Sequence, residues 1–81
     1  MNINVRLNGA LAQQIETTRL RVQLADSATV ADLLDHLRHQ YPNAASMINQ
    51  TVPFVAGKHL SATTQLTPNQ DIALLLPVAG G

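Results

Sequence analysis

The sequence contains no cysteine, few aromatic residues and few charges. Without cysteine, the chain has no disulfide, no thiolate nucleophile and no cysteine-ligated metal. Its aromatic residues are Tyr41 and Phe54, so we expect an aliphatic core. Charged residues make up 12% of the chain, well below the roughly 25% that is typical of globular proteins. At 81 residues, the chain is long enough for one small domain.

Neither excess charge nor a long apolar run is present. Five basic and five acidic residues cancel, so we expect no nucleic-acid partner and no membrane partner. The longest uncharged apolar run, residues 72–76, is far shorter than the roughly 20 residues of a membrane helix. Residues 1–6 contain no apolar stretch of the kind that secretory signals need. A cytoplasmic domain that functions in complexes is therefore expected, because charge-poor neutral surfaces tend to associate.

Two segments near the N-terminus alternate between apolar and polar residues. This period of two predicts half-buried strands over residues 2–8 and 19–24. The apolar positions are Ile3, Val5, Leu7, Leu20, Val22 and Leu24. Residues 10–17 between them are weakly patterned and fit a short helix or a loop. A connection of this length favours antiparallel pairing of the two strands.

The clearest helix follows. Thr29 is a good N-cap, and Asp32 stands at the position of the acidic partner in a capping box. Pro42 predicts the end of the helix, because the residue before a proline disfavours helical geometry. The apolar stripe of this helix consists of Val30, Leu33, Leu34, Leu37 and Tyr41.

The second half of the chain predicts more strands and tight turns. Residues 43–50 fit a short second helical turn, and residues 52–56 fit a strand in which Pro53 lies at an edge or at the start. Gly57 and Asn69 mark turns, and residues 72–76 predict a last strand inside the sheet. The order β-β-α-β-β predicts a two-layer α+β domain, with one long helix packed across a mixed sheet.

The histidines give no evidence of a catalytic or metal site. His36 and His39 fall on the polar side of the helix, each four residues after an aspartate, Asp32 and Asp35. We interpret this side as a solvated face, because two histidines without a third ligand bind zinc weakly. His59 stands alone, and no nucleophile set or phosphate-binding loop is visible. We therefore expect no metal site and no catalysis by this chain on its own.

The remaining candidate group is the α-carboxylate of Gly81. Residues 1–76 are predicted to form the folded domain, and residues 77–81 a flexible tail that ends in two glycines. The alternative interpretations of the two terminal glycines are a frayed chain end and a remnant of cloning. Glycines lack a Cβ, so such a tail can enter a narrow active site. Joining the carboxylate to AMP would supply a leaving group that a sulfur nucleophile can displace, which gives a thiocarboxylate.

The sequence resembles the ubiquitin-like sulfur carriers of the β-grasp fold, and among them the small subunits of molybdopterin synthase (MoaD-like proteins). Residues 76–81, Leu-Pro-Val-Ala-Gly-Gly, are similar to the Pro-Pro-Val-x-Gly-Gly ending of those subunits. Residues 66–73 resemble the turn and last strand of those subunits, and residues 29–42 resemble their helix. The chain departs from the pattern at Leu76, Asn69 and Ala56, which stand where a proline, a glycine and an asparagine are usual.

The resemblance implies a function and a set of partners. A ubiquitin-activating-type adenylyltransferase would use ATP to adenylate Gly81, and a persulfide donor would supply sulfur. The tail, Pro77, Val78, Ala79 and Gly80, would then enter the large subunit of molybdopterin synthase to form the molybdopterin dithiolene. Phe54 is a candidate interface residue, and the chain itself would bind no cofactor. Alternatives are a carrier for thiamine or a specialised metabolite, a ubiquitin-like modifier, and an interaction module with an inert tail.

Overall fold

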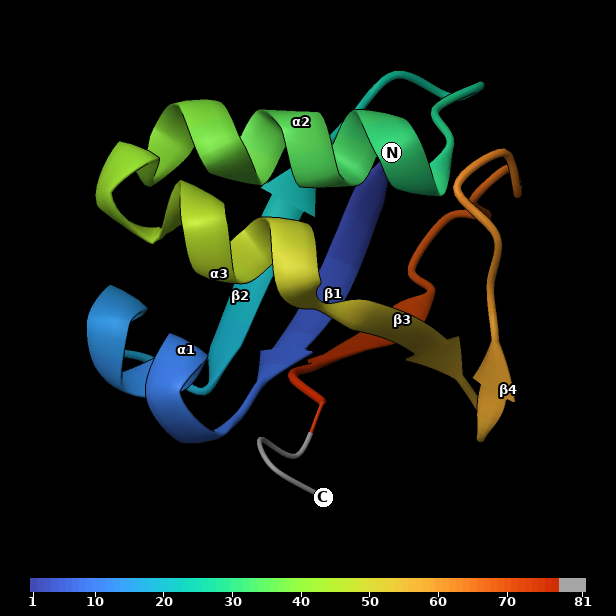
Figure 1. Ribbon diagram of the computed structural model, residues 1–81. Helices are drawn as coiled ribbons and strands as arrows, with labels where there is room; N and C mark the ends of the chain where they lie inside the picture. The colour runs from blue at the N-terminus through green and yellow to red at the C-terminus, as the bar shows by residue number, and fades with distance from the viewer. Residues whose placement is uncertain (78–81) are drawn as a thin grey trace.

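Residues 1–77, which the computed structural model describes, form a five-stranded mixed sheet and three α-helices (Figure 1). The predicted α+β class is confirmed, and the short helical turn expected within residues 43–50 is present. The segment left open between helix and loop forms a short helix, and the structure adds a two-residue strand to the predicted order. The elements are β1 (Asn2–Leu7), α1 (Gly9–Ile15), β2 (Arg19–Gln23), α2 (Val30–Gln40), the 3-10 turn η1 (Pro42–Ala44), α3 (Ala45–Gln50), β3 (Val52–Val55), β4 (Lys58–His59) and β5 (Asp71–Leu75).

The last strand of the chain occupies the centre of the sheet. The strand order is β2-β1-β5-β3-β4. β1 pairs antiparallel with β2, as predicted, with Ile3 opposite Val22. β5 pairs in parallel with β1 and antiparallel with β3. Like β1 and β3, β5 is hydrogen-bonded to a neighbouring strand on each edge, and this pairing fixes its position in the sheet.

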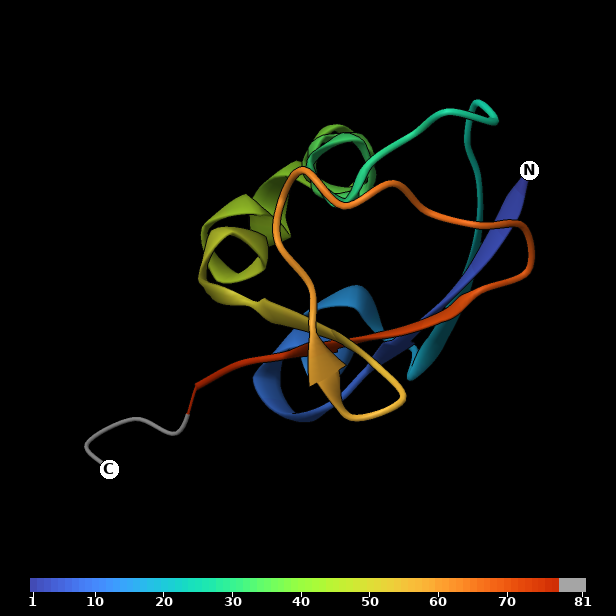
Figure 2. The ribbon, with the colours of Figure 1, turned by 90° about the vertical axis from the view of Figure 1, so that its right-hand side faces the viewer.

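The helices cover one face of the sheet only (Figure 2). Ile72 and Leu74 of β5 point toward this face and are fully buried, whereas Ala73 and Leu75 are half-buried on the opposite face. The uniformly apolar sequence of residues 72–76 thus conceals an alternation in burial. We call the face that carries Ala73 and Leu75 the open face. The core on the helix side comprises Ile3, Val5, Leu7, Leu11, Val22, Val30, Leu33, Leu37, Ala44, Ile48, Leu66, Ile72 and Leu74.

Helix α2 begins and ends as its sequence predicts. The Asp32 backbone N–H donates to Thr29 Oγ1 at 3.3 Å, and the Thr29 backbone N–H donates to Asp32 Oδ2 at 2.9 Å. These two bonds satisfy N–H groups that the first turn leaves without a helical partner. The helix ends at Gln40, before Tyr41 and Pro42. Among residues 1–77, no helix combines the length and the hydropathy that crossing a membrane requires.

Three residues with special backbone geometry form the predicted turns. Ala56 (φ 51°) and Gly57 (φ 79°) both have positive φ, the geometry of a type I′ turn, and join β3 to β4. Asn69 (φ 62°) turns the chain into β5, and the Gln70 N–H donates to the Thr67 carbonyl at 3.2 Å. Pro53 is the second residue of β3, as expected for a proline near a strand's start.

Candidate functional site

The predicted tail leaves the sheet from its central strand. β5 stays paired to its last residue, with Leu74 opposite Leu7 of β1 and Leu75 opposite Val52 of β3. Leu76 packs against the core, and Pro77 is the first exposed residue after the strand. The sheet therefore fixes the point from which the tail starts. Four predicted site residues lie outside the described residues, namely Val78, Ala79, Gly80 and Gly81.

An apolar strip on the open face adjoins this exit point. It consists of Val52, Phe54, Ala73 and Leu75, with Phe54 opposite Ala73 and Val52 opposite Leu75. All four residues are half-buried, and none belongs to the core or packs against it. Phe54, the residue predicted as a candidate interface position, thus lies on the helix-free side of the sheet. In β3, Phe54 lies two residues after Val52, which is opposite Leu75 at the end of β5.

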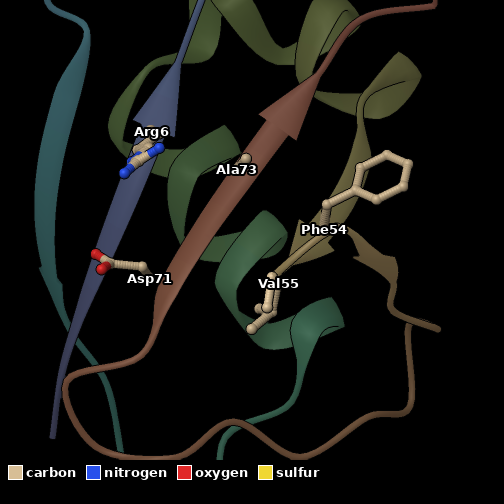
Figure 3. Close-up of a pocket in the computed structure, with 7 residues that line it drawn as sticks. Arg6, Phe54, Val55, Asp71 and Ala73 are labelled. Atoms are coloured by element: carbon tan, nitrogen blue, oxygen red, sulfur yellow. The ribbon is translucent and has the colours of Figure 1, made fainter.

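A shallow cavity of about 410 Å³ opens beside Phe54 (Figure 3). Arg6, Phe54, Asp71 and Ala73 line it from three strands, and residues 55–57 of the β3–β4 hairpin complete it. Of these residues, Phe54 alone was predicted from the sequence as an interface position. Arg6 and Asp71 were missed because 65 positions separate them, and only the parallel pairing of β1 with β5 brings them together.

The open face also carries an uneven share of the charge. Arg6, Arg19 and Arg21, which we call the arginine cluster, are exposed on alternate positions of β1 and β2. Three of the five basic residues are thus gathered on one half of one face. Among residues 1–77, the ion pairs join Met1 to Asp26 and Asp35 to Arg38 and His39, so none involves the arginine cluster. The few charges of the chain are therefore unevenly distributed over its surface.

The histidines of α2 lie away from the open face. His39 Nδ1 lies 3.8 Å from Asp35 Oδ1 and 2.9 Å from the Asp35 carbonyl oxygen, which confirms this predicted pair. The other predicted partner, Asp32, instead accepts hydrogen bonds from Thr29 in the capping box. Within residues 1–77, no three His, Asp or Glu side chains come together as metal ligands would. His59 contacts Phe54 on the open face, with ring centroids 5.7 Å apart.

Comparison with known proteins places the chain in a family. The sequence model of the ThiS family matches residues 5–81. No curated protein matches the sequence.

Among solved structures, SAMP1 from Haloferax volcanii is similar at a TM-score of 0.88 and 24% identity, with 100% of each chain covered. A second structure from the same organism, small archaeal modifier protein 1, gives a TM-score of 0.85 and 22% identity over 95% of this chain and 98% of the other. A Pyrococcus furiosus protein described as molybdopterin converting factor, subunit 1, gives a TM-score of 0.86 and 15% identity, with 96% of this chain and 99% of the other covered. At these identities the likeness shows a shared fold, and it confirms the predicted β-grasp architecture.

Proposed function

This chain belongs to the ThiS family of ubiquitin-like sulfur carriers and modifiers, and we propose that it is a cytoplasmic sulfur carrier, the small subunit of a molybdopterin synthase. In this role the chain is not catalytic alone. Its reactive group is the α-carboxylate of Gly81, and the catalytic residues belong to its partners. The partners are an adenylating enzyme of the ubiquitin-activating type and the large subunit of the synthase.

The chemistry requires activation of the carboxylate before sulfur can enter. An oxide ion is a poor leaving group, so a carboxylate does not react directly with a sulfur nucleophile. The adenylating enzyme joins Gly81 to the AMP portion of ATP and releases pyrophosphate. The terminal sulfur of a persulfide donor then displaces AMP and forms an acyl disulfide. A second thiol attacks the donor's sulfur in that disulfide, which releases the thiocarboxylate on Gly81 and leaves a new disulfide on the donor. The carrier supplies no side chain to these steps, because its tail only has to reach and fit the active site.

The position of β5 is the observation that carries this proposal. Neighbouring strands hold β5 on both edges up to Leu74, β3 continues to pair with Leu75, and Leu76 packs against the core. A tail that starts at Pro77 therefore begins from a defined point, which favours a docked, reproducible delivery of its end. The Pro-Val sequence before the diglycine and the structural likeness to the molybdopterin converting factor protein support this pathway over thiamine or specialised-metabolite synthesis.

A ubiquitin-like modifier is the second candidate. It is favoured by the likeness to two structures whose descriptions name an archaeal modifier protein. A modifier would use the same adenylated Gly81, but a lysine amine of a target protein would displace AMP and form an isopeptide bond. Both candidate functions use the same adenylated tail, and they differ in the nucleophile that displaces AMP from it.

Intact-mass measurement separates the candidates. The chain is incubated with the adenylating enzyme, ATP, a persulfide donor and a thiol reductant, and the expected product is heavier by the difference between sulfur and oxygen. Attachment to a lysine-bearing protein would support the modifier instead. A variant with one residue appended after Gly81 serves as the control, because it keeps the fold and moves the carboxylate. An extended variant that still acquires sulfur and supports molybdopterin synthesis would contradict the carrier proposal.

A further inference from the structure

Strand β2 forms one edge of the sheet and pairs with β1 on one side only. At the end of this antiparallel pairing, the Leu24 N–H donates to the Met1 carbonyl at 2.8 Å. Backbone bonds alternate along an antiparallel pair, so the even-numbered residues of β2 are the ones that bond to β1. The N–H and C=O groups of the odd-numbered residues therefore point away from the sheet. These residues are Arg19, Arg21 and Gln23.

A side chain satisfies the outward groups at the beginning of this edge but not farther along it. The Arg19 N–H donates to Thr17 Oγ1 at 3.3 Å, and the same hydroxyl donates to the Arg19 carbonyl at 3.0 Å. In the part of the chain that the structure describes, no hydrogen bond joins the outward groups of Arg21 or Gln23 to another residue. Unpaired groups of this kind are a template for pairing with another chain. The opposite edge strand, β4, has only two residues, so β2 is the longer free edge.

The two sides of β2 differ in their chemistry. Arg19 and Arg21 are exposed on the open face and take part in no ion pair among residues 1–77. On the helix side, Leu20 and Leu24 are half-buried on either side of the buried Val22 and pack against the core. The side chains of an added strand also alternate between the two faces of the sheet. One set would therefore lie beside the arginines and the other beside the leucines.

A second copy of this chain fits the edge poorly. In an antiparallel pair of two β2 strands centred on Arg21, the two copies of Arg21 would lie directly opposite each other. Like charges in this arrangement destabilise a strand pair. Carboxylates at the same positions would instead face the guanidinium groups and accept charge-assisted hydrogen bonds from them. The charge of the edge thus favours an acidic partner over self-association.

We propose that the outer edge of β2 binds an extended acidic segment of a partner protein, which joins the sheet as an additional antiparallel strand. A glutamate or aspartate of this segment lies opposite Arg21, and apolar side chains alternate with it and pack beside Leu20 and Leu24. Backbone bonds to Arg21 and Gln23 supply affinity, and the alternating side chains supply specificity. The proposal goes beyond the proposed function. Because β1 separates β2 from β5, the added strand leaves β5, which precedes the tail, uncovered.

The probe is a fluorescently labelled peptide of about ten residues in which glutamate alternates with valine, a length that exceeds the edge. Fluorescence anisotropy should show binding to the full-length chain, and a lysine–valine peptide should bind at least about tenfold more weakly. Arg21→Glu should weaken binding of the glutamate peptide by about tenfold or more at low salt, because it places like charges opposite each other. Lys58→Glu is the matched control. It makes the same charge change on β4, at the other edge of the sheet, and should bind like the wild type.

Backbone changes separate strand addition from simple attraction of charge. N-methylation of the glutamate amides removes the N–H groups that face β2 in an antiparallel pair, and it should abolish binding. N-methylation of the valine amides, which point away from β2, should leave binding unchanged. Gln23→Pro removes an outward N–H without removing a bond to β1, and it should weaken binding about tenfold. In the wild type, hydrogen exchange at the Arg21 and Gln23 amides should slow when the peptide binds.

Three results would overturn the proposal. Equal binding of the two N-methylated peptides would mean that charge alone holds the peptide. Equal binding of the glutamate and lysine peptides, or no binding of either, would remove the acidic segment as the occupant. A wild-type dimer in sedimentation experiments that Gln23→Pro disrupts would show that a second copy occupies the edge. None of these measurements involves the reaction of Gly81, so their outcome is independent of the proposed function.

Discussion

The Phe54 ring and the His59 imidazole lie 5.7 Å apart between centroids, with their planes inclined by 54°. The two residues are directly opposite each other in the β3–β4 hairpin. Tilted ring pairs at such distances contribute about 0.5–1.5 kcal/mol beyond the burial of their area. The contact therefore favours one orientation of Phe54 beside the cavity that it lines.

Phe54→Ala should weaken binding of the adenylating enzyme at least tenfold, because aromatic side chains at the centre of an interface often contribute most of the affinity. Calorimetric titration measures the affinity. The variant loses the ring contact with His59 but no core packing, so the melting temperature should fall by several degrees while the domain stays folded. Phe54→Leu retains apolar area and should lose less affinity than Phe54→Ala. Equal affinities for wild type and Phe54→Ala would show that the ring lies outside the interface.

Ala56→Asn should stabilise the domain by about 0.5–1 kcal/mol. Ala56 has φ 51°, in the left-handed region that an alanine adopts at a cost, and asparagine is preferred at this position of a type I′ turn. Chemical denaturation measures the free energy of unfolding. Ala56→Val places a β-branched residue in the same conformation and should destabilise. A lower stability of Ala56→Asn would mean that the turn geometry does not limit stability here.

Local sequence patterns predicted much of this fold. The alternation of Ile3, Val5 and Leu7 determines one strand, and Thr29 with Asp32 defines the start of α2, since both signals depend on neighbouring residues only. The helix α1 was left open between helix and loop, because residues 10–17 have a weak pattern and its packing in the fold decides it.

The site depended on information that the sequence does not show locally. The cavity and the arginine cluster exist only once β1, β2 and β5 are in register, because Arg6, Arg21 and Asp71 are widely separated in the chain. Net charge gives a sum and says nothing about where the charges lie. The continuous apolar sequence of β5 also conceals which residues face the helices, and only the one-sided helix layer shows that Ala73 and Leu75 lie on the open face.

Asn69→Ala should destabilise the domain by roughly 1 kcal/mol, whereas Asn69→Gly should be neutral or slightly stabilising. Asn69 has φ 62°, which asparagine and glycine tolerate and alanine does not. Its N–H also donates to the Asn2 carbonyl at 2.7 Å, a bond that both variants retain. Thermal unfolding compares the three proteins. Equal melting temperatures for the alanine and glycine variants would contradict the backbone explanation.

Thr29→Ala should cost about 1 kcal/mol of unfolding free energy, because the Asp32 N–H then loses its cap acceptor. Thr29→Ser keeps the hydroxyl and is the matched control, which should remain near wild-type stability. Hydrogen exchange of the first-turn amides of α2 locates the effect. If both variants lost the same stability, the methyl group rather than the hydroxyl of Thr29 would be the stabilising part.

One glycine inserted between Pro77 and Val78 should slow adenylation about a hundredfold under single-turnover conditions, because misplacement of a reacting group by even about 1 Å can have such an effect. The insertion moves Gly81 by up to about 3.5 Å relative to the docked domain. It leaves β5 and the Leu76 anchor intact, so the melting temperature should not change. A second variant combines the insertion with deletion of Ala79. It restores the distance from Pro77 to Gly81 and should recover most of the rate. A lengthened tail that reacts at the wild-type rate would show that the anchor at β5 does not position the carboxylate, and the docked delivery proposed for this carrier would then be wrong.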